Sequence, residues 1–142
     1  MWLLPIRLPR IWMKCVSAVK RNQDRGLNDV QLFEVGPEFY SNKPGDQAMV
    51  ACGIRAGAYT PKHWALNTRG VDVFDAKADA LDALAALDAP KTQVFRKAPK
   101  WYHPGRSGSL CLGKNVLAHF GEIHPAILKA FDIKTPVVAF EV

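Results

Sequence analysis

The stretch HPGRSGSLCLGKNVLAHFGEIHP holds the side chains whose types and spacing could carry out chemistry. Gly108 and Gly113 bracket four residues and are followed by Lys114, a spacing similar to that of a phosphate-binding loop. Ser107 stands before a glycine with His103 close by, which is a setting for a nucleophilic serine and its base. The two chemistries to test are therefore phosphate binding and nucleophilic catalysis.

The residues around the lysine argue against a phosphate-binding loop. Such a loop leads from a strand into a helix and has Ser or Thr after the lysine, where Asn115 stands here. Residues 109–112 alternate polar and apolar as a half-buried strand does, and VLAHFG indicates a second strand. We therefore predict a hairpin with its turn at Gly113–Asn115. The predicted pairs are Gly108 with Phe120, Ser109 with His119, Leu110 with Ala118, Cys111 with Leu117 and Leu112 with Val116.

The serine and the histidines match no catalytic or metal-binding motif. A nucleophile elbow has Gly-x-Ser-x-Gly between a strand and a helix, whereas glycine follows Ser107 directly here and a strand comes next. The pair of His103 and Ser107 also lacks an evident acidic partner. The spacing of His119, Glu122 and His124 fits no zinc motif, and the cysteines form no Cys-x-x-Cys pair. We predict no catalytic residue and no metal site.

The elements that must position these residues follow from the apolar periodicity. Helices are predicted at residues 10–25, from Asp75 to before Pro90, and at 124–131 with Pro125 in the first helical position. Strands are predicted at residues 29–36, 47–57, 92–95, 108–112, 116–121 and 136–142. Gly36-Pro37 is expected to end the first strand, and a Pro-rich loop is expected from Ala98 to Gly105. Because strands outnumber helices and short turns join several of them, the sequence predicts an α+β fold with a largely antiparallel sheet.

The helix that Asp75 opens has one apolar side and several acids. The apolar side, which we predict to be buried, consists of Ala78, Leu81, Leu84 and Ala85. The acids, which resemble a carboxylate cluster, are Asp72, Asp75, Asp79 and Asp82. Since the first turn of a helix favours negative side chains, we interpret these acids as helix-stabilising residues.

Composition and charge limit the classes of protein. The chain has 142 residues, 49% of them hydrophobic and 23% charged, which suffices for one globular domain with a single core. No apolar run approaches the roughly 18 residues that cross a bilayer, so we expect no membrane association. The odd number of cysteines (Cys15, Cys52 and Cys111) favours reduced, buried thiols and a cytoplasmic location. The net charge of +6 lies mainly within residues 1–26, which we interpret as the solvated face of a helix, with contact to nucleic acid as the alternative.

Four blocks of sequence, in this order along the chain, carry a resemblance to a known family. They are FEVGP (33–37), FDAKADALDAL (74–84), WYHPGRSG (101–108) and HFGEIHPAIL (119–128). Together they resemble the beta subunit of bacterial-type phenylalanyl-tRNA synthetase over about residues 16–142, while residues 1–15 match it poorly. The resemblance implies that residues 1–142 are a single domain, the catalytic-like module of that subunit, with the antiparallel sheet and flanking helices of a class II aminoacyl-tRNA synthetase. It also implies that the chain is a piece of the subunit.

The same resemblance implies that this module is a scaffold and that the alpha subunit carries out the chemistry. An active class II site needs a Phe-Arg-x-Glu strand, and the matching residues here are Phe39-Tyr40-Ser41-Asn42. A second ATP-binding arginine is absent from the junction Gly121–Pro125. The chain is therefore expected to hold no cofactor and to be inactive alone, with ATP and magnesium serving the whole enzyme. The loop residues His103, Pro104, Gly105 and Arg106 are expected to be structural or to contact a partner.

The expected partners are the alpha subunit and, in the whole enzyme, tRNA. Self-association of the isolated chain is also predicted, through the N-terminal segment, a sheet edge or both, because Pro136–Val142 and the first dozen residues are strongly apolar. Two alternatives stay open. The first is a stand-alone RNA-binding module that uses an aromatic–basic cluster, which comprises Arg96, Lys97, Lys100 and Trp101, with Tyr102 and Arg106 beside them. The second is an ATP-dependent ligase-like paralogue.

Overall fold

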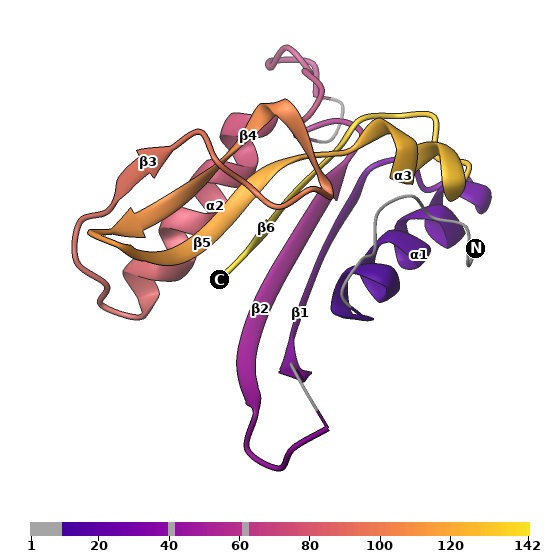
Figure 1. The fold of residues 1–142 in the computed structure, drawn as a ribbon. Helices are drawn as coiled ribbons and strands as arrows, with labels where there is room; N and C mark the ends of the chain where they lie inside the picture. Colours follow the sequence, from indigo (N-terminus) through magenta and orange to yellow (C-terminus); the bar gives the residue numbers. More distant parts are fainter. Residues whose placement is uncertain (1–9, 40–41, 61–62) are drawn as a thin grey trace.

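A computed structural model describes residues 10–39, 42–60 and 63–142, which form three helices and a six-stranded sheet (Figure 1). The helices are α1 (Arg10–Asp24), α2 (Val73–Ala86) and α3 (Pro125–Ala130). The strands are β1 (Val30–Phe39), β2 (Gln47–Ala56), β3 (Gln93–Phe95), β4 (Tyr102–Leu112), β5 (Asn115–Ile123) and β6 (Val137–Glu141). Their order in the sheet is β1-β2-β6-β5-β4-β3, and every neighbouring pair is antiparallel. The predicted antiparallel sheet with flanking helices is confirmed.

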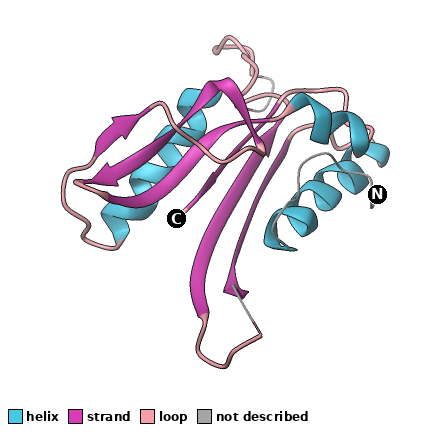
Figure 2. Cartoon of the chain, in the orientation of Figure 1, coloured by secondary structure: helices cyan, strands magenta, loops and turns pink. Residues whose placement is uncertain are grey.

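The helices lie on both faces of the sheet (Figure 2). Helices α1 and α3 pack on one face, in a core cluster that includes Trp12, Val16 and Ile127. Helix α2 packs on the other face, against β5 and β6, in a separate core cluster that includes Ala80 and Val138. We call these the α1 face and the α2 face. None of the helices in the described part of the chain is both long and apolar enough to cross a membrane.

Strand β1 is longer than predicted, because Gly36-Pro37 does not end it. The strand continues to Phe39 and pairs with β2 along its whole length, with Pro37 opposite Met49. Proline lacks an N–H group and is tolerated in a strand that lies at the edge of a sheet, as β1 does. The predicted strand end was therefore wrong because the tertiary position of β1 decides whether proline fits.

The β4–β5 hairpin confirms most of the predicted pairing. Gly108 pairs with Phe120, Ser109 with His119 and Leu110 with Ala118, as predicted. The register then shifts, so that Cys111 pairs with Val116 and Leu112 with Asn115, in place of the predicted partners. The turn is accordingly Gly113-Lys114, one residue shorter than predicted, with Gly113 at φ 61°. Two-residue turns with positive φ match the twist of paired strands, which explains the shorter turn.

Helix α2 begins earlier than predicted and buries a different side. Asp72 is its N-cap and accepts hydrogen bonds from the backbone N–H groups of Phe74 and Asp75, while the Asp75 carboxylate accepts from the Asp72 N–H. The buried residues of α2 are Asp75, Ala76, Ala80 and Leu84, whereas Ala78, Leu81 and Ala85 are exposed. Alanines occur on both sides of α2, so hydrophobicity alone did not identify the side that faces the sheet.

Strand β6 lies in the middle of the sheet and not at an edge. It pairs with β2 on one side and with β5 on the other, and Val137, Val138 and Ala139 are almost fully buried. A strand that is apolar on both faces fits the centre of a sheet, so Pro136–Val142 does not itself offer the sheet edge expected for self-association. The edges of the described sheet are β1 and β3.

Candidate functional site

The HPGRSG segment forms a wide bulge inside β4. Tyr102 pairs with Ile123 and Ser107 pairs with Gly121, so the four residues His103–Arg106 lie opposite Glu122 alone. The predicted loop through Gly105 therefore ends at Tyr102, because the chain is extended from there and pairs with β5 at both ends of the bulge.

Hydrogen bonds within the bulge use the groups that had suggested catalysis. The Ser107 hydroxyl donates to the His103 carbonyl oxygen at 2.7 Å, and His103 Nδ1 accepts from the Gly105 N–H at 3.0 Å. The His103 ring therefore holds the backbone and does not activate Ser107. Arg106 Nη1 lies 3.1 Å from Glu122 Oε2, in an ion pair in which the arginine side chain is 62% exposed.

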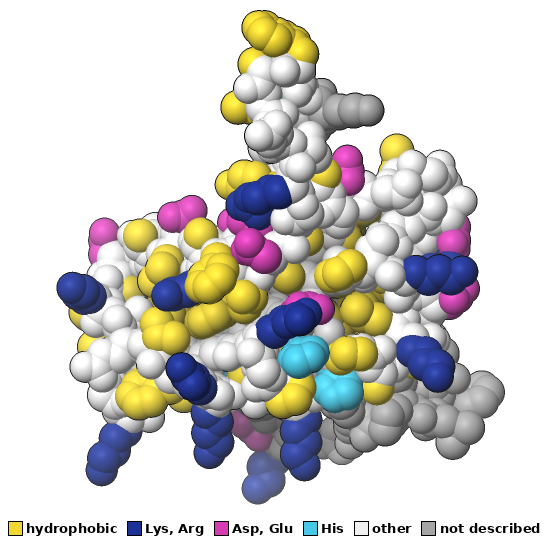
Figure 3. All heavy atoms as spheres, turned by 90° about the horizontal axis from the view of Figure 1, so that it is seen from above, with side chains coloured by type: hydrophobic (Ala, Val, Ile, Leu, Met, Phe, Trp, Pro, Cys, Tyr) yellow, Lys and Arg dark blue, Asp and Glu magenta, His cyan; other side chains and the backbone are white. Residues whose placement is uncertain are grey.

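The aromatic–basic cluster separates into an exposed and a buried part. Arg96, Lys97 and Lys100 are exposed, whereas Trp101 is half-buried and Tyr102 is only 2% exposed. The interpretation of Tyr102 as a base-stacking residue was wrong, because its ring packs edge-on against Trp12 in the core. Figure 3 shows several Lys and Arg side chains along the lower border of the view, with hydrophobic side chains between them. The exposed basic residues thus remain available for contacts, without Tyr102 as a stacking platform.

A row of polar side chains crosses the α1 face from strand to strand. Consecutive strands place these residues in register: Ser109 on β4, His119 on β5, Glu141 on β6, Cys52 on β2 and Glu34 on β1. Directly opposed residues of neighbouring strands point to the same face of a sheet, so these side chains form one line. The sequence analysis predicted the pair of Ser109 and His119 but missed the rest of the row, because Glu141 reaches it through β6, which pairs with the distant strand β2.

Glu141 is the most buried acid of the row. Its Oε2 accepts a hydrogen bond of 2.9 Å from the Trp12 indole N–H, and the residue is 8% exposed. Burial raises the pKa of Glu141 to about 7, despite the stabilising hydrogen bond from Trp12. The buried polar atoms Glu141 Oε1, Tyr102 OH and Trp101 Nε1 have no hydrogen-bond partner among the described residues.

The serine and histidine of the row are bonded to each other and to the backbone. The Ser109 hydroxyl donates to the Lys97 carbonyl oxygen and lies 2.8 Å from His119 Nδ1, from which it can only accept. Burial lowers the pKa of His119, which keeps its ring neutral near pH 7. Ser109 is 2% exposed, so no substrate reaches its oxygen. The arrangement fixes β4 to β5 and does not generate a nucleophile.

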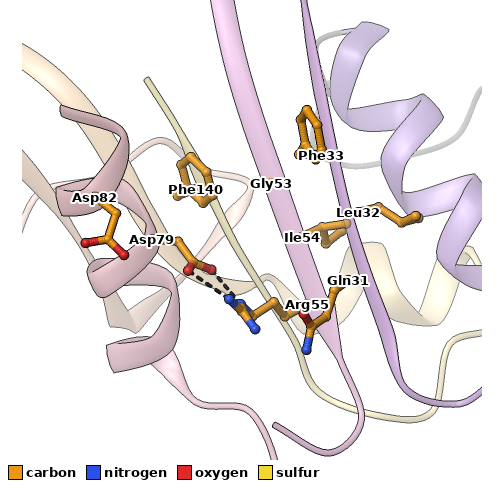
Figure 4. Close-up of a pocket in the computed structure, with 9 residues that line it drawn as sticks. All are labelled: Gln31, Leu32, Phe33, Gly53, Ile54, Arg55, Asp79, Asp82 and Phe140. Atoms are coloured by element: carbon orange, nitrogen blue, oxygen red, sulfur yellow. Dashed lines mark hydrogen bonds and ion pairs between the residues drawn. The ribbon is translucent and has the colours of Figure 1, made fainter. Parts of the chain in front are cut away.

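A shallow hollow of about 340 Å³ lies on the α2 face, between α2 and strands β1, β2 and β6 (Figure 4). Arg55 on β2 points into it and is held by Asp79 on α2, with contacts of 2.5 Å (Nε–Oδ2) and 2.9 Å (Nη2–Oδ1). The ring of Phe140 covers Gly53, where an added Cβ would lie 2.3 Å from Phe140 Cε1. The guanidinium is therefore already neutralised by Asp79, which leaves it poorly suited to grip a phosphate.

Three of the four acids that resemble a carboxylate cluster make separate structural contacts. Asp72 and Asp75 cap α2, Asp75 also binds Arg69 at 2.7 Å, and Asp79 binds Arg55. The hydrogen bond from Arg69 is the main cause that lowers the pKa of Asp75. No group of three or more His, Cys, Asp or Glu side chains in the described residues is arranged to hold a metal ion.

The positions of the two ATP-binding arginines are only partly described. Tyr40 and Ser41, which occupy the first position, lie outside the described residues. At the second position β5 ends at Ile123, two residues later than predicted, and α3 begins at Pro125, as predicted. His124 is the N-cap of α3, and its Nδ1 accepts a hydrogen bond from the Ala126 N–H at 3.0 Å. The start of this helix presents a capping histidine and a proline, without an arginine.

The fold is similar to that of part of an aminoacyl-tRNA synthetase. A pyrrolysyl-tRNA synthetase from Desulfitobacterium hafniense superposes with a TM-score of 0.63 over 94% of this chain and 45% of that chain, at 12% sequence identity. A second crystal structure of the enzyme from this organism gives a TM-score of 0.62 at 13% identity, with the same coverage. At such low identity the likeness concerns the fold alone.

The chain belongs to the family of the phenylalanyl-tRNA synthetase beta chain CLM domain, which matches residues 9–142. The phenylalanine–tRNA ligase beta subunit of Rhodospirillum rubrum is 50% identical over 135 residues, covering 94% of this chain. That of Paramagnetospirillum magneticum is 51% identical over 140 residues, covering 97% of this chain. The chain spans only 17% and 18% of the lengths of these two relatives. The resemblance inferred from the four sequence blocks is confirmed.

Proposed function

We propose that this chain is the non-catalytic, class II synthetase-like module of a phenylalanine–tRNA ligase beta subunit. In this role it supports the attachment of phenylalanine to its tRNA by the alpha subunit in the cytoplasm. ATP and magnesium would be bound by the whole enzyme, and the alpha subunit and tRNA would be the partners of the complete subunit. The family match over residues 9–142 supports the assignment to this subunit.

One observation above all supports the non-catalytic role. At the junction of β5 and α3, where an active class II site carries an ATP-binding arginine, His124 caps the helix and Pro125 begins it. Two polar pairs on the neighbouring strands are engaged within the fold: Arg106 with Glu122, and Ser109 with His119. This junction therefore lacks the arginine that would bind the triphosphate of ATP and stabilise the transition state.

The test is phenylalanine-dependent exchange of pyrophosphate into ATP by the isolated chain. We expect no exchange above background, whereas a complete alpha–beta ligase, measured in parallel as the control, exchanges readily. Exchange by the isolated chain that is lost in the Arg106→Ala variant would contradict the proposal. A positive test exchanges modules: the R. rubrum beta subunit with its matching segment replaced by this chain should still assemble with its alpha subunit and charge tRNA.

RNA binding is a second candidate function, because three basic residues that could contact phosphates are exposed: Arg96, Lys97 and Lys100. Under this alternative the isolated chain binds RNA with an affinity that falls as salt increases, and replacing the three residues by alanine lowers both the affinity and its salt dependence. Absence of binding to tRNA at low salt would remove this candidate. The ligase-like alternative requires ATP binding, and calorimetry with ATP and phenylalanine decides it.

A further inference from the structure

Two of the cysteines meet in the core, although they are 37 residues apart in the sequence. The sulfur atoms of Cys15 on α1 and Cys52 on β2 lie 3.5 Å apart, and both side chains are buried. The third cysteine, Cys111 on β4, is also buried, and among the described residues it makes no such contact with another thiol. The chain therefore contains a thiol pair and, in Cys111, a built-in control.

The surroundings of the pair make the two thiols chemically unequal. The hydrogen bond with Cys52 is the main cause that lowers the pKa of Cys15, while the same contact raises the pKa of Cys52. Burial and the Glu34 carboxylate oppose this lowering of the Cys15 pKa, and Lys14, whose ammonium lies 3.4 Å from Glu34, supports it. Either sulfur can be the donor in this contact, and the lowered pKa of Cys15 favours it as the thiolate, which is the reactive form of cysteine.

We propose that Cys15 and Cys52 form a redox modification site, in which a small peroxide converts the two thiols into a disulfide that joins α1 to β2. Helix α1 and strand β2 are already in contact, so the bond needs only a small approach of the sulfur atoms, from 3.5 Å to about 2.05 Å. The proposal does not depend on the function proposed above.

The reaction has two balanced steps. The Cys15 thiolate attacks one oxygen of hydrogen peroxide, the O–O bond breaks, and the products are a sulfenic acid on Cys15 and, after protonation, water. The Cys52 sulfur then attacks the Cys15 sulfur, the S–O bond breaks, and a second water leaves with the proton of Cys52. In total two thiols are oxidised and one peroxide is reduced to two waters. A dithiol reductant reverses the change.

Burial determines which oxidants reach the site. Cys15 is 4% exposed and Cys52 is 1% exposed, so a bulky disulfide reagent reaches them only when the protein opens. A peroxide is close to water in size and needs a much smaller opening. We therefore expect hydrogen peroxide to form the bond faster than an aromatic disulfide reagent of the same oxidising equivalents.

The experiment treats the purified chain with hydrogen peroxide, blocks the remaining thiols, and maps its peptides by mass spectrometry without reduction. We expect a peptide that links Cys15 to Cys52, and we expect the free thiols counted in denaturant to fall from three to one. The link should form equally in the Cys111→Ser control and disappear after dithiothreitol. Oxidation should also raise the melting temperature of the wild type and of Cys111→Ser, but not that of Cys15→Ser.

Peptide mapping of the unaltered chain requires no variant, so the proposal remains testable if Cys52→Ser fails to fold. It is overturned if peroxide oxidises Cys111 as fast as Cys15 without a Cys15–Cys52 link. It is also overturned if every disulfide that forms is intermolecular. The same holds if all three thiols stay reduced while other residues are oxidised.

Discussion

The two faces of the sheet are covered in different ways. On the α1 face, large side chains such as Trp12 and Tyr102 are fully packed and enclose polar groups, among them Glu141. On the α2 face, the small residues Ala76 and Ala80 allow close packing over β5 and β6, but α2 reaches the hairpin of β1 and β2 only at β2, where Asp79 binds Arg55. Phe33 is 81% exposed there. Stability should therefore reside mainly on the α1 face, and the open part of the α2 face is free for contacts.

The largest expected effect comes from truncating the main anchor of the α1 face. Trp12→Ala should lower the free energy of unfolding by about 3–5 kcal/mol, because it leaves a large cavity and removes the hydrogen bond to Glu141. The matched control on the other face, Phe33→Ala, should change it by no more than about 0.5 kcal/mol. Urea unfolding followed by circular dichroism measures both. Equal losses in the two variants would remove the distinction between the faces.

The second prediction uses the buried acid of the α1 face. The pKa of Glu141 is about 7 in the folded chain, against 4.5 for the free side chain, so the folded state binds more protons between these values. Stability should therefore fall as pH rises from 4.5 to 7, by about 3 kcal/mol at most, and the Glu141 contribution should be constant above that range.

The Glu141→Gln variant is the control for this pH dependence. Its stability should lack the fall, since glutamine does not titrate. The lowered pKa of His119 has the opposite effect, because it increases the free energy of unfolding as pH rises. Both proteins contain His119, so the difference between their free energies of unfolding reports on Glu141 alone. Parallel stability profiles of the two proteins between pH 4.5 and 7.5 would show that Glu141 is not buried as an acid.

The third prediction concerns self-association, for which the open part of the α2 face now offers a surface. The exposed apolar side chains on the β1–β2 hairpin are Phe33 (81%), Val35 (58%) and Met49 (68%). We expect a twofold dimer at micromolar concentration, and we expect Phe33→Asp to weaken it at least about tenfold, since a charge would be buried in the contact. Leu87→Asp, at an exposed site next to α2, is the control. Light scattering during size exclusion measures both, and a wild type that stays monomeric would contradict the prediction.

The smallest effect is expected at the bulge of β4. Arg106→Ala should lower the free energy of unfolding by about 0.2–1 kcal/mol, because the ion pair with Glu122 is largely exposed to solvent. Arg106→Lys should lie within this range as well. A loss comparable to that of Trp12→Ala in thermal unfolding would mean that the bulge stabilises the sheet directly.

Local signals in the sequence predicted much of the fold. Helix α1 ends before Gly26, which has a φ of 83°, and α3 begins with Pro125, as the sequence indicated. The β4–β5 hairpin was also predictable, because its strands are adjacent and Gly108 needs the cover of Phe120, whose Cζ would lie 2.9 Å from an added Cβ. In each of these cases the interacting residues are close in the sequence.

The features that escaped prediction depend on distant parts of the chain. The central place of β6 results from pairing with β2, more than 80 residues earlier, which no local pattern encodes. The line of Ser109, His119, Glu141 and Cys52 exists only once that pairing is known. The contact between Cys15 and Cys52 escaped for the same reason, since it depends on how α1 lies on the sheet.

Strand β2 changes its neighbours along its length, which determines how the sheet opens in solution. Residues 52–56 pair with both β1 and β6, whereas residues 47–50 pair with β1 alone among the described strands. Figure 1 shows this outer part of the hairpin extending beyond the rest of the sheet. A two-stranded ribbon is marginally stable by itself, and amide protons exchange through local openings. Deuterium should therefore enter residues 48–50 well before residues 54–56, so that one continuous strand belongs to two cooperative units.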